Sequence, residues 1–240
     1  MKKIIFLLIL MTPFLMSFAQ KSKKNTIDNG VAFYIGINYS KPTRTEFEKY
    51  ISVVSDTMHL TSSIIPQTTY GLNLGMTLRN GNWEFEGGGV LSSGIKTQSS
   101  NVAKSNFASL SLSTIDIHFG FSNYILGPLF IGADLGAISN GGKLQVNENT
   151  PVSHFEDSPE SLNPFKGYVF SVRPKAGFFF PFKAGKYSGI KLNAYYDYGI
   201  SKYDFYNSHI FQSRLINYTG STKSSLNGFG AQVVLVIGGN

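Results

Sequence analysis

Hydrophobic and polar residues alternate with a period of two along most of this chain. Within residues 70–78 every second position is Tyr, Leu or Met, and the positions between them are Gly, Asn or Thr. After the four residues Arg-Asn-Gly-Asn the alternation resumes, with aromatic residues on one face and Glu84 and Glu86 on the other. A period of two is that of a β-strand with two different faces, and the intervening residues favour a tight hairpin turn.

The same pattern predicts eight strands. They cover residues 31–39, 68–78, 83–94, 110–123, 129–138, 168–180, 190–200 and 226–237. No helical period of useful length is evident, so the pattern predicts an all-β fold. Pro174 lies inside the sixth strand, and the apolar face of the fourth strand changes side near Ser113 and Thr114. Pro174 predicts a bulge or a distorted strand start, because proline cannot donate to a strand ladder. The change of side predicts a bulge, because an extra residue moves side chains to the other face.

The connections between these strands alternate between short and long. Short turns join strands two and three, four and five, and six and seven. The long connections are residues 40–67, 95–109, 139–167 and 201–225. In an up-and-down sheet every second connection lies at the same end, so all short turns fall at one end and all long loops at the other. Outer-membrane barrels show this arrangement, with short periplasmic turns, longer outer loops and an even strand number. The chain is therefore predicted to be a closed, eight-stranded, antiparallel, up-and-down transmembrane β-barrel.

The composition of the polar face indicates which face meets lipid. That face is rich in Gly, Asn, Thr and Ser, whereas the exterior of a soluble barrel would carry many Lys and Glu residues. Aromatic residues collect near the predicted strand ends, as in the two aromatic girdles of membrane barrels. They are Tyr39, Tyr70, Trp83, Tyr124, Tyr168, Phe180, Phe182 and Tyr187. We expect the apolar face to contact lipid; the alternative is a periplasmic, lipocalin-like ligand-binding barrel whose apolar face lines a cavity.

The inward face carries the few charges of the strands. The predicted lumen residues are Glu84, Glu86, Asp116, His118, Asp134, Arg173, Lys175, Lys191 and Asp197. An eight-stranded barrel is just wide enough for its side chains to fill, so acidic side chains of strands three to five would meet basic ones of strands six and seven. We interpret this set as an ion-pair network that fills a polar lumen. A narrow channel for protons or ions is the alternative.

The start of the chain is typical of a secretory signal peptide. Lys2 and Lys3 precede an apolar run, and Ser17-Phe18-Ala19 is a small-x-small cleavage signal. This predicts a signal peptide at residues 1–19, a short periplasmic segment at 20–30 and the barrel at 31–240. The chain has no cysteine, so ladders and packing must hold the exported fold. The net charge is +7, and no dense basic stripe predicts binding of nucleic acid.

The candidates for catalysis or metal binding are few. The four histidines are His59, His118, His154 and His209, and all but His118 lie in long loops. His118 follows Asp116 on the inward face, about 7 Å along the strand, where a hydrogen-bond network is expected. The loop residues His154, Glu156, Asp157 and Glu160 have ligand chemistry, but a solvated acidic loop explains them. No helix follows Gly87-Gly88-Gly89, so it is not a phosphate loop. We predict no catalytic residue, cofactor or metal ion.

With a leader ending in Ser-Phe-Ala-Gln and eight alternating strands, the chain resembles the PorT-like outer-membrane β-barrel family of Gram-negative bacteria. It is also similar in plan to the small OmpX- and OmpA-type barrels. The resemblance implies an integral outer-membrane protein with a structural or surface-interaction role; a lipid A-modifying enzyme is the alternative within this class. The expected partners are membrane lipid and envelope or surface proteins that contact loops 40–67, 139–167 and 201–225, because binding residues tend to lie on loops held by a rigid scaffold.

Overall fold

Eight strands close into an antiparallel ring in this computed structural model, which describes residues 29–103, 105–147, 161–162, 168–183, 186–205 and 220–238. The ring order is β1, β2, β3, β5, β6, β8, β9, β12, and β12 pairs with β1. The bounds are β1 Gly30–Thr43, β2 Thr69–Asn80, β3 Trp83–Gly94, β5 Phe107–Leu126, β6 Leu129–Asn147, β8 Tyr168–Pro181, β9 Gly189–Gly199 and β12 Asn227–Gly238. The prediction of an eight-stranded antiparallel barrel is confirmed.

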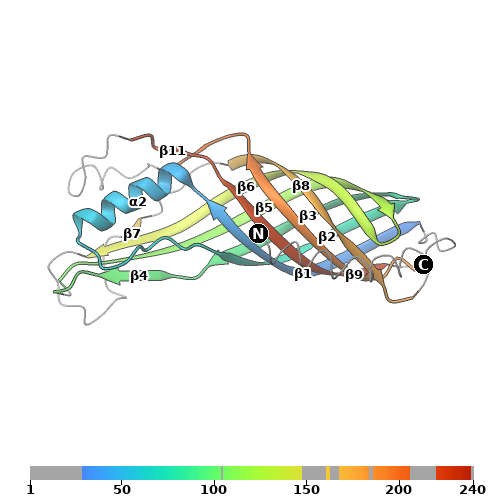
Figure 1. Ribbon diagram of the computed structural model, residues 1–240, viewed down its shortest axis with the longest axis horizontal. Helices are drawn as coiled ribbons and strands as arrows, with labels where there is room; N and C mark the ends of the chain where they lie inside the picture. Colours follow the sequence, from blue (N-terminus) through green and yellow to red (C-terminus); the bar gives the residue numbers. More distant parts are fainter. Residues whose placement is uncertain are drawn as a thin grey trace, which may run out of the picture.

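The other elements belong to the long connections and gather at one end of the barrel (Figure 1). They are helix α2 Thr45–Thr57 and the short strands β4 Thr97–Ser100, β7 Ser161–Leu162, β10 Tyr203–Asp204 and β11 Lys223–Ser224. β4 and β7 lengthen the wall beside β5 and β6, whereas β10 and β11 pair with each other. The short turns lie at the opposite end, where Gly81 and Gly127 adopt positive φ angles of 60° and 56°.

Helix α2 contradicts the prediction that no helix is present. Phe47, Tyr50, Ile51 and Val54 are buried on it, at the spacing i, i+3, i+4, i+7 of an amphipathic helix. These side chains pack with Leu110 and other inward-facing residues of the barrel wall in one apolar cluster. The signal was therefore present in the sequence, inside a stretch that the strand pattern assigned to a loop. No helix in the described part of the chain is long and apolar enough to cross a membrane.

The bulge predicted near Ser113 and Thr114 is also wrong. β5 and β6 keep one register through this point, where Ser113 pairs with Gly141 and Thr114 with Asn140. Leu110 and Leu112 lie on the same inward face of β5 as Asp116. They are closer to the loop end of the barrel, where they pack against α2. The apparent change of face is thus a change in what fills the barrel, from charged side chains to an apolar core.

Pro174 is accommodated without the predicted bulge. It pairs with Ala133 of β6, and that register is unshifted over residues 168–178 of β8. On the other side, the pairs Val172–Tyr198 and Lys175–Tyr195 of β8 and β9 share one register and flank a gap in the ladder. Pro174 points outward, and its missing N–H removes a ladder bond without adding a residue to the strand.

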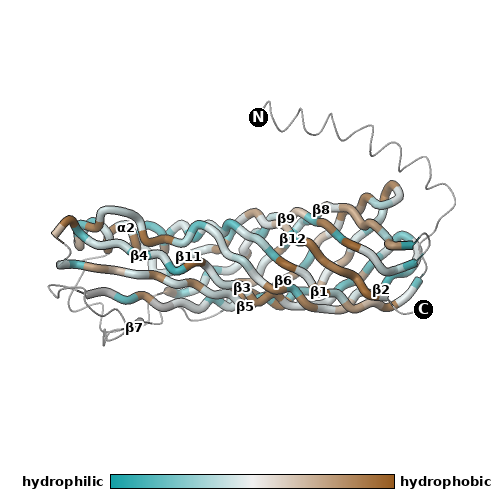
Figure 2. Tube along the Cα trace, turned by 90° about the horizontal axis from the view of Figure 1, so that it is seen from below, coloured by the Kyte–Doolittle hydropathy of each residue, from teal (hydrophilic) through white to brown (hydrophobic). Residues whose placement is uncertain are grey.

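Apolar side chains cover the outside of the ring, and polar ones point into it. On β1, the alternate residues from Val31 to Tyr39 are 41–66% exposed, whereas Ala32, Tyr34 and Asn38 are at most 7% exposed. Figure 2 shows that hydrophobic positions recur along β1, β2, β6 and β12. The run of nine residues from Val31 to Tyr39 matches the roughly 9–11 residues with which a tilted strand crosses a bilayer. An apolar exterior around a polar interior is typical of a membrane barrel and the reverse of a soluble one.

Candidate functional site

The interior of the barrel contains three layers. Near the short turns lies a mainly aromatic layer, whose buried residues are Ala32, Tyr34, Tyr124, Phe130, Phe179, Tyr187, Val234 and Val236. The middle layer holds the charged side chains. At the loop end lies the apolar cluster beneath α2, which also includes Tyr203, Phe205 and Leu226. The charged layer is therefore enclosed from both ends, and it is our candidate site.

All nine residues predicted for the lumen lie on the inward face of their strands. Their positions alternate with the exposed apolar residues along β3, β5, β6, β8 and β9. Eight are buried, and the side chain of Glu86 is 8% exposed. The structure brings them together in two groups of ion pairs. One group centres on the two lysines and the other on Arg173.

The first group joins β3 to β6, β8 and β9. Lys191 pairs with Glu84, and its Nζ lies 2.6 Å from Oε2 of Glu86. Lys175 pairs with Glu86, and its Nζ lies 2.5 Å from Oδ1 of Asp134. Two lysines thus share three carboxylates in an alternating chain. Buried charges require such pairing, because an uncompensated charge in a dry interior is costly.

Glu84 connects this chain to the aromatic layer. Its Oε2 accepts hydrogen bonds from the hydroxyls of Tyr124 and Tyr187, at 2.8 and 2.7 Å. Arg79 lies beside them, with its guanidinium 3.6 Å from the centre of the Tyr124 ring. The strand predicted to end at Leu78 continues to Asn80, so Arg79 keeps the inward parity of that strand. Extending the alternation by one residue would have placed Arg79 in the lumen.

The second group centres on Arg173. Its Nη2 donates to Oδ2 of Asp116 and its Nε to Oδ1 of Asp197, both at 2.6 Å. The guanidinium also lies 4.5 Å from the centre of the Tyr195 ring, and the Tyr195 hydroxyl donates to Asn38 at 2.7 Å. One arginine thereby ties β8 to β5 and β9. Charge-assisted hydrogen bonds of this length are the stronger kind.

His118 lies inside the bore, away from the lipid edge that a lipid-modifying enzyme would need. Its Nε2 is 3.2 Å from the hydroxyl of Tyr34, and its Nδ1 is 3.6 Å from Oδ2 of Asp116. His118 is 1% exposed, so no lipid headgroup reaches its imidazole in this arrangement. His59 lies in the loop after α2, while His154 and His209 fall outside the described residues, as do Glu156, Asp157 and Glu160. Among the residues that are described, no group of three or more His, Asp or Glu side chains could hold a metal ion.

Glycines make room for the largest lumen side chains. A Cβ atom on Gly88 would lie 2.0 Å from the Tyr34 hydroxyl oxygen, and one on Gly75 would lie 2.4 Å from it. A Cβ atom on Gly230 would lie 2.1 Å from Cζ of Tyr195. These positions explain why the polar face is rich in glycine. They let tyrosines reach across a bore that eight strands make narrow.

No protein-family model matches the chain, and no curated protein matches its sequence. Among solved structures, the chain is similar to Ail, the attachment invasion locus protein of Yersinia pestis, in complex with the heparin analogue sucrose octasulfate. The identity is 13%, the match covers 88% of this chain and 99% of that one, and the TM-score is 0.44. Neisserial surface protein A matches with 7% identity over 87% and 96% of the two chains and a TM-score of 0.43. The outer membrane protein OprG from Pseudomonas aeruginosa matches with 9% identity over 89% and 95% and a TM-score of 0.38. These likenesses concern the barrel fold alone.

Proposed function

We propose that this chain is an integral outer-membrane barrel with a structural or surface-interaction role. The observation that carries the proposal is the belt of exposed apolar side chains around a closed ring whose polar residues point inward. In water such a belt would drive aggregation, because soluble monomers rarely expose large contiguous apolar patches. In lipid the arrangement is favourable, since a closed ring pairs its backbone groups between strands.

The proposed interaction surface is the outer platform, defined as α2, β4, β10, β11 and residues 107–112 of β5. The platform stands on its own apolar core, in which Phe47, Ile51 and Val54 are fully buried. Such a core holds α2 and β10 in one arrangement against the barrel wall. Rigidly displayed connections are where binding residues of a scaffold concentrate. Of the loops predicted to contact partners, 40–67 contributes α2 and 201–225 contributes β10 and β11 to this platform, whereas 139–167 contributes none of the elements that define it.

Two alternatives receive less support from the interior of the barrel. An open channel would need a continuous water path, whereas the three layers fill the bore with aromatic rings, ion pairs and apolar side chains. A ligand-binding barrel of the lipocalin kind would need its apolar face inside, and here that face is outside. Export by the signal peptide at 1–19 and membership of the PorT-like family stay predictions, and residues 1–28 lie outside the described part of the chain.

The test of membrane residence is fractionation followed by gel electrophoresis. The exported protein should stay in the membrane fraction until detergent is added, and the unheated sample should migrate differently from the boiled one, because a closed barrel resists the gel detergent. A protein that remains in solution without detergent would overturn the proposal. Deleting the gene should leave the mass spectrum of lipid A unchanged. An altered lipid A mass would favour the alternative of a lipid A-modifying enzyme.

A further inference from the structure

Arg44 is a buried charge without a hydrogen-bonded counter-charge. It lies between β1 and α2 and is 1% exposed, and none of its three guanidinium nitrogens has a hydrogen-bond partner among the described residues. Glu48 is close, but its Oε1 accepts a hydrogen bond from the backbone N–H of Arg44 at 2.8 Å. Arginine keeps its charge in proteins, and a buried charge is costly unless hydrogen bonds compensate it. The guanidinium therefore requires a partner that the described part of the chain does not supply.

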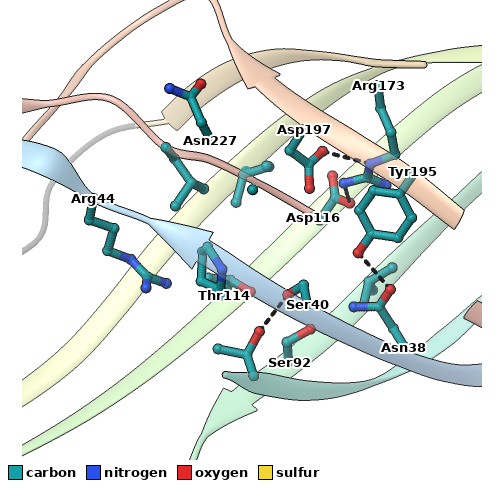
Figure 3. A pocket seen from close by; sticks show the side chains of 16 residues that line it. Asn38, Ser40, Arg44, Ser92, Thr114, Asp116, Arg173, Tyr195, Asp197 and Asn227 are labelled. Atoms are coloured by element: carbon teal, nitrogen blue, oxygen red, sulfur yellow. Dashed lines mark hydrogen bonds and ion pairs between the residues drawn. The ribbon is translucent and has the colours of Figure 1, made fainter. Parts of the chain in front are cut away.

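The side chain of Arg44 points into a cavity between the charged layer and the platform core (Figure 3). The cavity has about 30 Å³ of space for the centres of water-sized molecules. One water needs roughly 10–15 Å³ by this measure, so the cavity has room for two or three waters or one small ion. Hydroxyls of Ser40, Thr69, Ser92 and Thr114 contribute to its polar wall. The hydroxyls of Ser40 and Thr69 share a hydrogen bond of 2.6 Å, and none of the four groups carries a negative charge.

Arg173 lines the same cavity from the charged layer. Its Nε and Nη2 are bound to carboxylates, but its Nη1 has no hydrogen-bond partner among the described residues. Asp116 and Asp197 also line the cavity and each binds Arg173 at 2.6 Å, while Oδ1 of Asp116 has no hydrogen-bond partner among the described residues. Two guanidinium groups thus present free N–H donors to one small space. Guanidinium groups and hydroxyls at such a space are the donors that bind anions.

We propose that this cavity is a binding site for a small monovalent anion, of the size of a halide or formate ion, held between Arg44 and Arg173. The inference goes beyond the proposed function, because it depends on the interior of the barrel and not on the membrane around it. Burial lowers the pKa of Arg44, and the nearby Tyr203 and Glu48 act in the opposite direction. A bound anion would act in the same direction as those two groups and would keep the guanidinium charged.

Bromide is the probe for the position of the anion. Crystals of the detergent-solubilised protein grown in sodium bromide should show an anomalous-scattering peak within hydrogen-bond distance of the Arg44 guanidinium. Formate added in excess should remove the peak, because both ions would occupy the same space. Arg44→Gln should abolish the peak, and the matched control Lys41→Gln, which removes an exposed charge three residues before Arg44, should keep it. A wild-type map with water alone in the cavity would overturn the proposal.

A solution measurement covers the case in which Arg44→Gln does not crystallise. The thermal unfolding midpoint of the wild type and of Lys41→Gln should rise and saturate with bromide, relative to an equal ionic strength of gluconate, which is too large for the cavity. Arg44→Gln should need at least tenfold more bromide for the same rise. Equal responses of the three proteins would contradict the site. If Arg44→Gln fails to fold, the wild-type bromide map decides the question by itself.

Discussion

The Nζ atom of Lys191 on β9 lies 2.6 Å from Oε2 of Glu86 on β3, and these two strands stand on opposite sides of the ring. Three strands separate them in either direction around the barrel. Their side chains therefore meet near the axis and cross the bore at this level. Glu84, two residues before Glu86 and on the same face of β3, pairs with the same ammonium group. The pair closes the lumen and at the same time fixes the distance between opposite walls.

Removing Lys191 should weaken the barrel substantially. Lys191→Met leaves two buried carboxylates without one of their cations, so we expect the free energy of unfolding to fall by about 3–5 kcal/mol, the usual loss for one partner of a buried pair. Urea titration, read from the mobility of the unheated protein on gels, measures the change. The control Lys41→Met removes an exposed lysine and should cost well under half as much. Equal losses of unfolding free energy in the two variants would show that the ion-pair network does not stabilise the barrel.

Leu72 distinguishes a lipid-facing surface from a packed core. It is 42% exposed on the outside of β2. Leu72→Arg should lower the stability of the barrel in a bilayer by about 2–4 kcal/mol if the residue lies at the midplane. Leu72→Ile should change it little, because lipid chains repack around either side chain. Unfolding in lipid vesicles gives both values. A large loss from the isoleucine variant would indicate protein packing around Leu72 and would contradict the lipid belt.

The ring and the lumen were predictable because strand alternation is a strong local signal. Each residue's face follows from counting by two, so Asp116, Asp134 and Asp197 could be placed inside without any knowledge of contacts. For the ion pairs, the sequence predicted only that acidic strands lie opposite basic strands, and not which carboxylate binds which cation. The choice of Glu86 for both Lys175 and Lys191 depends on strand stagger, which a hydrophobic pattern does not specify.

The helix of the platform was missed because its period begins directly after a strand and within a polar connection. The stripe Phe47, Tyr50, Ile51 and Val54 has a helical period, but it follows a strand directly and lies in a connection rich in polar residues. Arg44 was likewise assigned to a loop, where a charged residue needs no explanation. Its burial depends on α2 folding over it, and that packing is a tertiary effect that the local pattern does not contain.

The platform core should respond to mutation separately from the barrel. Ile51 is fully buried on α2, so Ile51→Ala should cost about 2–5 kcal/mol of local stability through lost contacts and a cavity. Hydrogen exchange followed by mass spectrometry should show lost protection over residues 45–57 while β1 and β12 stay protected. Ser52→Ala, on the exposed side of the same turn, is the control and should leave exchange unchanged. Loss of protection throughout the barrel would show that the platform and the ring unfold as one unit.

The wild-type protein should conduct little in planar bilayers, because three successive layers block the bore. Phe179 and Tyr187 fill it near the short turns, the pair Lys191–Glu86 crosses its middle, and the cluster beneath α2 closes the loop end. Removing one layer leaves the other two, so Ile51→Ala should not raise the conductance even where it releases α2. The measurement is single-channel recording of the purified protein. The baseline is the current from protein that was refolded free of lipid-soluble contaminants. Large, stable current steps from the wild type would show that the filled lumen opens in a bilayer, and the channel alternative would then replace the closed barrel.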